Sequence, residues 1–362
     1  MDAKQDRAAK LVRLDHFMAE RALDAVWLVD ANDFGWLLGG DNLVNHRTAD
    51  GVAAVGYDGA DLTVLTSNIE APRLRAEEVP ADVAVESFPW HETTLAEAIA
   101  ARSGGSYGAD VHLPGAIRID PVALRMPLTP YDIDRAGRLG SSIARGLETA
   151  CRAIEPADTE RAVAAAVGAE LAARGIHAPV LLVGGGDRAP VHRHFTPTDS
   201  PIGTYALVSV SATRGGLWMS ATRTVAFDPP SWLAARHEKV QRVDSAVIRA
   251  TETVETAGAA FEALQAAYAA VGEAGEWQTH HQGGASGYGA REWVATPAHT
   301  GTVHRPQTYA WNPTIRGTKS EDTVLVTSDN HELLTQTGEW PTSAIPPPNG
   351  GEPVVRPEIL YR

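Results

Sequence analysis

The chain has 362 residues, of which 44% are hydrophobic and 21% are charged, so it is long enough for two globular domains. The formal net charge of −14 argues against nucleic acid and anionic membranes as partners, and the single cysteine, Cys151, excludes a disulfide framework and a cysteine-rich zinc site. No stretch reaches the ~18 apolar residues of a membrane span, and the charged N-terminus is not a signal peptide, so we expect a cytoplasmic protein.

The first third of the chain alternates between helical and extended patterns, which is typical of a small α/β domain. Apolar spacing predicts a helix over 5–23, and the run DAVWLV (24–29) predicts a buried strand that ends in a turn at Asn32 and Asp33. A DGAD turn between two further strands indicates a hairpin. The other expected elements are strands at 52–57, 62–67 and 83–88 and helices at 70–78 and 93–102.

A proline-punctuated stretch at 119–132 marks the expected domain boundary, and we predict one domain at 1–127 and another at 128–362. In the second domain two helices precede a group of strands. This order occurs over 132–227 and again over 232–327, which indicates an internal duplication of folding units.

Within the second domain, Thr159 is the expected N-cap of the second helix. The proline-rich tail from residue 341 is expected to form a loop or an arm. The expected helices are 133–151, 160–173, 232–252 and 257–272, and the expected strands are 179–186, 205–213, 217–227, 308–315 and 320–329.

Two segments combine histidines with features of a binding site. HRHFTPTD (192–199) places three cationic or titratable groups just before an expected strand, and histidine is the side chain best suited to proton transfer near neutral pH. A solvated basic loop is the alternative. THHQGGASGYGARE (279–292) combines histidines with glycines that let backbone approach a ligand closely. It matches neither a phosphate-binding fingerprint nor HExxH, and it lacks the carboxylates that usually complete a zinc site.

The third segment, NPTIRGTKSEDTVLVT (312–327), contains the carboxylate pair Glu321 and Asp322 at the start of a strand. Alternation along a strand points the two side chains to opposite faces, so one faces a pocket and the other faces solvent or a partner. A charged strand start without function is the alternative. Trp218 lies close to these segments and either fills the core or forms a wall of a pocket.

Five segments, in this order, resemble the pita-bread fold of the aminopeptidase P, prolidase and creatinase family. The resemblance implies an α/β (α+β) protein, in which a creatinase-like N-terminal α/β domain precedes a pita-bread domain with a pseudo-twofold duplication. Residues 1–127 resemble the family's smaller N-terminal domain. The matching segments are the helix and turn at 128–160, RHFTPTD, ALVSVSATRGGLWMSATRT, HHQGGASGYGARE and AWNPTIRGTKSEDTVLVT.

The metal-ligand positions of this family are altered here. In its metallopeptidase members two Asp, one His and two Glu hold a pair of divalent ions. The corresponding residues of this chain are Ser209, Ser220, Gly284, Asn312 and Glu321. Two dications need several anionic oxygen ligands to offset their dehydration. Because only Glu321 keeps a carboxylate, the resemblance implies a site without metal, and we expect no other cofactor.

Creatinase, one branch of the family, hydrolyses a C–N bond of a small guanidino acid without metal. This chain resembles it in keeping a His, His194, and a Glu, Glu321. The resemblance implies that His194 is the general base and acid, and that Glu321 accepts hydrogen bonds from a cationic or N–H-rich part of the substrate. Arg291 matches an Arg that could clamp a carboxylate. Thr222 replaces a guanidinium-binding Glu, and a related branch hydrolyses ectoine, so the substrate class stays open.

The expected function is a metal-independent, creatinase-like enzyme that cleaves a C–N bond of a small amino-acid-derived or guanidino/amidine substrate, by hydrolysis or by elimination. Its partner is expected to be a small molecule. A homodimer is expected from the resemblance, in which Arg47 reaches the partner subunit's pocket. The expected substrate-binding residues are Arg291, Asn312, Ser209, Ser220, His281, Gln282, Trp218 and Arg47.

Two alternatives remain. The chain could be a catalytically inactive pita-bread module that binds peptides or a partner, as a histone-chaperone branch of this fold does. It could also keep one metal ion, bound through Glu321 and either His280 or His281.

Overall fold

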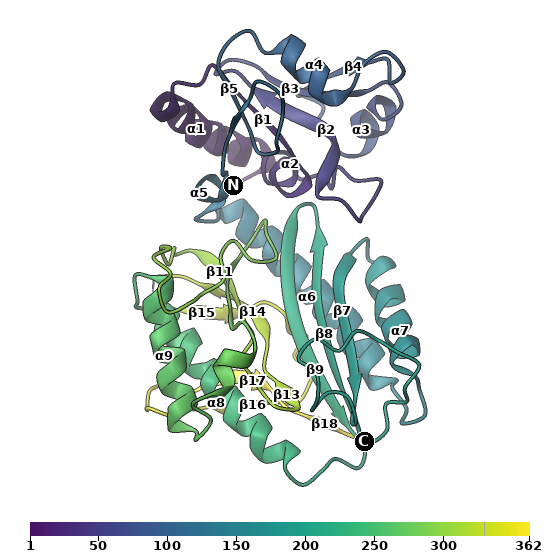
Figure 1. Ribbon diagram of the computed structural model, residues 1–362, viewed down its shortest axis with the longest axis vertical. Helices are drawn as coiled ribbons and strands as arrows, with labels where there is room; N and C mark the ends of the chain where they lie inside the picture. The colour runs from purple at the N-terminus through teal and green to yellow at the C-terminus, as the bar shows by residue number, and fades with distance from the viewer. Residues whose placement is uncertain (329) are drawn as a thin grey trace. The chain divides into compact units, whose positions relative to one another are not determined.

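The computed structural model describes residues 1–328 and 330–362 (Figure 1). The chain forms two compact units, Met1–Tyr131 with Arg214–Leu217, and Asp132–Thr213 with Trp218–Arg362. The proposed domain ranges, 1–127 and 128–362, differ from these units at the junction and at the short second segment of the first unit. Within the described residues, none of the helices combines the length and the apolar character needed to cross a bilayer.

The first unit is built on a mixed six-stranded sheet in the order β4-β3-β2-β1-β5-β6. The predicted hairpin is confirmed, because β2 and β3 pair antiparallel across the DGAD turn. Its strands are β1 (Ala25–Asp30), β2 (Asp50–Tyr57), β3 (Leu62–Ser67), β4 (Ala84–Phe88), β5 (Tyr107–Ala109) and β6 (Ile117–Arg118). Its helices are α1 (Ala3–Arg21), α2 (Ala31–Leu38), α3 (Ala71–Glu77), α4 (Leu95–Arg102) and α5 (Val122–Arg125).

The turn predicted at Asn32 and Asp33 is wrong, since both residues lie in the first turn of α2. The Asp30 side chain caps this helix by accepting from the Asn32 amide at 2.8 Å. An acidic residue in the first turn of a helix is favoured by the helix dipole, so the Asn-Asp pair is compatible with a helix start. Asp33 is buried and pairs with Arg125 at 2.6 Å.

The second unit repeats one arrangement twice, as the predicted duplication requires. Helices α6 and α7 precede the sheet β18-β9-β8-β7, and α8 and α9 precede the sheet β10-β11-β14-β15. Figure 1 shows α6 and α7 in teal alongside β7–β9, and α8 and α9 in green beside the second set of strands. The helices are α6 (Pro130–Arg152), α7 (Glu160–Ala172), α8 (Leu233–Thr251) and α9 (Ala257–Ala270). The strands before the tail are β7 (His177–Gly185), β8 (Tyr205–Arg214), β9 (Leu217–Ala226), β10 (Gly283–Ser286), β11 (Gln307–Trp311), β12 (Thr314–Ile315), β13 (Thr318–Lys319), β14 (Asp322–Val326) and β15 (His331–Leu333).

Local sequence accounts for most of these elements. The predicted apolar stripe of α6 is buried along Ala136, Leu139, Ile143 and Leu147. Thr159 is the N-cap of α7, as predicted, and its hydroxyl accepts from the Ala162 amide at 3.1 Å. The last residue of the strand predicted at 320–329 lies outside the described residues.

The tail beyond residue 341 is not the predicted loop. It forms the antiparallel pair β16 (Thr342–Ile345) and β17 (Val354–Pro357), and β18 (Leu360–Tyr361) then pairs parallel with β9. The reason is a long-range charge interaction. Arg356 on β17 is completely buried, and its guanidinium pairs with Asp244 at 2.6 Å and with Asp322 at 2.9 Å.

A buried ion network joins the two halves of this unit. Arg223 on β9 pairs with Glu148 on α6 at 2.9 Å and with Asp322 on β14 at 2.9 Å, and Asp322 also binds Arg356. Asp322 therefore faces the interior, so the expectation that it faces solvent or a partner is wrong. Such a network holds the halves in register, because each buried charge requires its partner.

We predict that Arg223→Met lowers the free energy of unfolding by about 3–5 kcal/mol, because Glu148 and Asp322 would be left buried without their shared cation. Urea denaturation of both proteins measures this difference. Arg161→Met removes an exposed pair with Asp199 and is the matched control, with an expected change below about 1 kcal/mol. Equal effects of the two substitutions would show that the network does not hold the fold.

Candidate functional site

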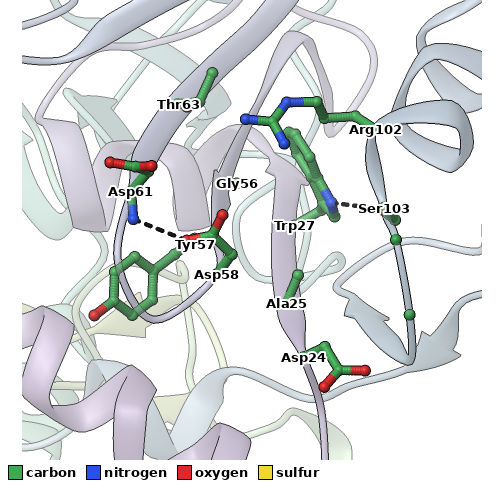
Figure 2. Close-up of a pocket in the computed structure, with 12 residues that line it drawn as sticks. Asp24, Ala25, Trp27, Gly56, Tyr57, Asp58, Asp61, Thr63, Arg102 and Ser103 are labelled. Carbon is green, nitrogen blue, oxygen red and sulfur yellow. Dashed lines mark hydrogen bonds between the residues drawn. The ribbon is translucent and has the colours of Figure 1, made fainter.

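Each unit contains a cavity, and the chemistry of the two differs. A hollow of about 500 Å³ in the first unit lies between the start of β1, the β2–β3 turn and the segment after α4 (Figure 2). Two of its polar contacts are internal hydrogen bonds. The Trp27 indole donates to the Ser103 hydroxyl at 2.9 Å, and the Asp61 amide donates to the Asp58 carboxylate at 2.8 Å. Most of the residues singled out from the sequence lie in the other cavity.

That second cavity measures about 490 Å³ and lies within the second unit. Residues Pro179–Leu182 of β7 supply part of its wall, and polar side chains from five further segments converge on it. The structure therefore brings together most of the predicted site residues from distant parts of the sequence. The polar side chains with potential chemistry are His194, Ser209, Ser220, His281, Arg291, Asn312, Lys319 and Glu321.

Glu321 is the central charged group of this cavity, and both of its oxygens have partners. Oε1 accepts from Arg291 Nη2 at 3.1 Å, and Oε2 lies 2.6 Å from Lys319 Nζ and accepts from the Thr222 hydroxyl at 2.8 Å. Burial alone would raise the pKa of Glu321, but Lys319 and Arg291 outweigh it and hold that pKa below its usual range. The carboxylate is therefore ionised and neutralised by two cations.

Strand alternation explains this clustering. Lys319 and Glu321 are two positions apart in the extended segment from β13 to β14, so they point to the same face. Ser320 and Asp322 point to the other face, where the Ser320 hydroxyl donates to Asp244 at 2.6 Å and Asp322 joins the ion network.

Hydroxyl groups stand at two of the positions that the resemblance assigns to metal ligands, and they support the charged centre. Ser209 on β8 bonds to the Thr222 hydroxyl at 2.7 Å, and Thr222 in turn donates to Glu321. Ser220 on β9 accepts from Arg291 Nη1 at 3.1 Å and donates to Ser211 at 3.0 Å. Both serines are buried. Ser209 positions Glu321 through Thr222, and Ser220 positions Arg291 directly.

Three histidines meet beside the charged centre. The Nε2 atoms of His194 and His280 are 3.1 Å apart and hydrogen-bonded, which fixes the orientation of the His194 ring. His281 stacks on His280 with ring centroids 4.5 Å apart. Burial, with nearby positive charges including Lys319, lowers the pKa of His280 to about 2, and burial with Arg291 lowers that of His281 to about 4. Both rings are therefore neutral at neutral pH.

The remaining predicted residues differ in position. Asn312 is buried and lines the cavity, and its Oδ1 has no hydrogen-bond partner among the described residues. Gln282 is buried outside the cavity lining, and its Oε1 accepts from the Tyr268 hydroxyl at 2.8 Å. Trp218 lies on β9 outside the cavity lining, and Arg47 is exposed in the α2–β2 segment of the first unit.

Sequence reasoning missed Lys319, and it considered His280 only as a possible ligand of a single metal ion. Lys319 was detectable, because it stands two positions before Glu321 in an extended segment. His280 was visible within the glycine-rich segment, but its contact with His194 joins loops that are 86 positions apart. Sequence spacing carries no information about that contact.

The fold and the cavity define a pita-bread protein, in which two helix–helix–sheet halves enclose one site. The sequence model of metallopeptidase family M24 matches residues 133–328, and the chain belongs to this family. The predictions of family and fold are therefore confirmed. No curated protein sequence matches the chain.

Solved structures share this fold over nearly their whole length. Dipeptidase PepE from Mycobacterium ulcerans is 18% identical with a TM-score of 0.74, and the match covers 93% of this chain and 97% of that one. The prolidase from Pyrococcus horikoshii OT3 is 19% identical with a TM-score of 0.73, over 91% and 98% of the two chains. The N-terminal domain of FACT complex subunit SPT16 from Cicer arietinum (chickpea) is 14% identical with a TM-score of 0.65, over 92% and 97%.

The family name implies a metal centre, but the residues present do not fit a pair of divalent ions. The five positions that the resemblance assigns to metal ligands supply one carboxylate, and its oxygens are engaged by Lys319 and Arg291. A Cβ at Gly284 would overlap the carbonyl oxygen of Trp293, so the backbone leaves no room for a ligand side chain there.

The ring nitrogens of His194, His280 and His281 lie within 4.8 Å of one another. Lys319 and Arg193, which lower the pKa of His280, would repel a dication at that cluster as well.

We predict that acid weakens the fold partly through His280. An unfolded imidazole binds a proton below pH ~6.5, whereas folded His280 resists protonation until about pH 2, so stability is lost as the pH falls from ~6.5. His280→Gln should lose on the order of 1 kcal/mol less than the parent between pH 7 and pH 5, as measured by urea denaturation. The exposed His91 is the control, and His91→Gln should leave the pH dependence unchanged. A parallel pH dependence for His280→Gln and the parent would contradict the assignment.

Proposed function

We propose that this chain is a metal-independent hydrolase that cleaves a C–N bond of a small amino-acid-derived or guanidino/amidine substrate in the second cavity. The observation that carries this proposal is the pairing of Glu321, at a position that the resemblance assigns to a metal ligand, with Lys319 and Arg291. Two fixed cations can stabilise negative charge that develops on a substrate, which is the task that metal ions perform in metallohydrolases.

In this mechanism His194 removes a proton from the attacking water, and the new C–O bond forms at the substrate carbon. Protonated His194 then delivers the proton to the departing nitrogen as the C–N bond breaks. The hydrogen bond to His280 orients the His194 ring for both steps. Arg291 and Lys319 stabilise the negative charge that builds on the substrate between these steps.

Glu321 receives a different role from the one expected. Its oxygens already accept from Arg291 and Thr222 and contact Lys319, so we assign it to holding the two cations rather than to binding a cationic substrate. Ser209, Ser220 and His281 support this arrangement, and Asn312 faces the substrate. The homodimer completed by Arg47 and the cytoplasmic location remain proposals based on the resemblance and the composition.

A catalytically inactive module that binds a peptide or protein partner is the second candidate. The fold shared with the N-terminal domain of FACT complex subunit SPT16 favours it. A module of that kind has no use for a histidine oriented for proton transfer beside a charged cavity, so His194 discriminates between the two functions.

We predict that chelator-treated protein hydrolyses at least one substrate in a panel of small N-acyl amino acids, guanidino acids and amidines, followed by NMR. His194→Ala should reduce the rate by about 10²–10⁴-fold, because it removes the acid–base group. The control is His192→Ala, an exposed histidine of the same loop, which should keep the parent rate. Loss of turnover on chelation, or full activity of His194→Ala, would contradict the mechanism. Saturable peptide binding without turnover on any substrate would favour the inactive module.

A further inference from the structure

The cavity carries more positive charge than its own groups neutralise. Lys319 and Arg291 share one carboxylate, Glu321, which leaves a net charge of +1 at the centre. The other titratable groups that line the cavity are His194, from the β7–β8 loop, and His281, and neither is an acid that could offset this charge. An anionic ligand would neutralise the excess, whereas a cationic ligand would add to it.

The two cations differ in what they still offer a ligand. Both terminal nitrogens of Arg291 are engaged, since Nη1 donates to Ser220 and to the Ala290 carbonyl and Nη2 donates to Glu321, whereas its Nε is buried and lacks a partner among the described residues. The ammonium group of Lys319 forms an ion pair with Glu321 alone among the described residues, and an ammonium group has three N–H donors. Lys319 therefore has more donors to spare for an anion than Arg291, whose one unpartnered nitrogen, Nε, is buried.

Asn312 supplies a second, independent indication of a ligand. Its side chain is 2% exposed and lines the cavity, yet its Oδ1 accepts no hydrogen bond within the described part of the chain. A buried carbonyl oxygen without a donor is unfavourable, and a ligand N–H would satisfy it. The cavity thus pairs an anion-binding ammonium group with an acceptor for an N–H group.

We propose that the ligand of this cavity is a small N-acyl amino acid, whose carboxylate binds Lys319 and whose amide N–H donates to Asn312. The proposal rests on the proposed function and narrows its substrate class. A guanidino acid fits less well, because it brings a cation to Lys319 and Arg291 while Glu321, the carboxylate that would accept it, is already engaged.

Isothermal titration of the His194→Ala protein tests this without turnover. The four ligands are N-acetylglycine, N-acetylglycinamide without the carboxylate, N-acetylsarcosine without the N–H, and guanidinoacetate. N-acetylglycine should bind saturably, and each of the others about ten-fold more weakly or worse. Equal or tighter binding of N-acetylglycinamide or guanidinoacetate, or no binding of any of the four, would overturn the proposal.

Variants then locate the contacts. In the same His194→Ala background, Lys319→Met should abolish the preference for N-acetylglycine over its amide, and Lys319→Arg should keep it. Asn312→Ala should abolish the preference over N-acetylsarcosine. Lys239→Met, which alters a surface ion pair with Glu273, is the control and should change neither preference.

Unchanged preferences in folded Lys319→Met and Asn312→Ala proteins would refute these contacts. If Lys319→Met does not fold, Asn312→Ala and the four-ligand comparison decide the outcome.

Failure of this inference is distinguishable from failure of the proposed function. The expected binding pattern without turnover in the protein that retains His194 would refute the function and leave the ligand class standing. Turnover of guanidino acids with no preference for N-acyl amino acids would refute the ligand class and leave the function standing.

Discussion

The contact between Glu321 and its two cations is the interaction on which the rest of the site depends. The carboxylate lies 2.6 Å from Lys319 and 3.1 Å from Arg291. A chain of hydroxyl groups, Thr222 on β9 and Ser209 on β8, supports it by hydrogen bonds. A buried carboxylate needs compensating charge, which metal ions would otherwise supply. Here the protein supplies it, so the pita-bread scaffold keeps a cationic centre made of its own side chains.

The scaffold holds this centre through a second set of charges on the reverse side of the same strand. Glu321 faces the cavity while its neighbour Asp322 pairs with Arg223 and Arg356. In this second cluster Arg223 and Arg356 pair with Glu148, Asp322 and Asp244, and burial raises the pKa of Asp244 to about 7. Because Asp322 connects both halves of the second unit and the C-terminal strands, a change in this network would displace Glu321 as well.

Local patterns in the sequence predicted much of the fold, and long-range contacts determined the rest. The helix α6 and the β2–β3 hairpin follow from apolar spacing and turn residues, which act within a few positions. The tail strand β17 depends on Arg356 reaching Asp244, more than a hundred positions away, and no local pattern reports that contact. The same holds for the site. Lys319 was predictable from strand alternation, whereas the contact between His194 and His280 depends on tertiary packing.

We propose that Lys319 and Arg291 take the electrostatic role of a metal pair. The most direct test is elemental analysis of the full chain, purified without added metal and again after incubation with excess Mn²⁺, Co²⁺ or Zn²⁺ followed by gel filtration. We expect well below one ion per chain in every sample, because the one carboxylate of the centre is already neutralised. One or two stoichiometric ions per chain that persist through gel filtration would contradict it.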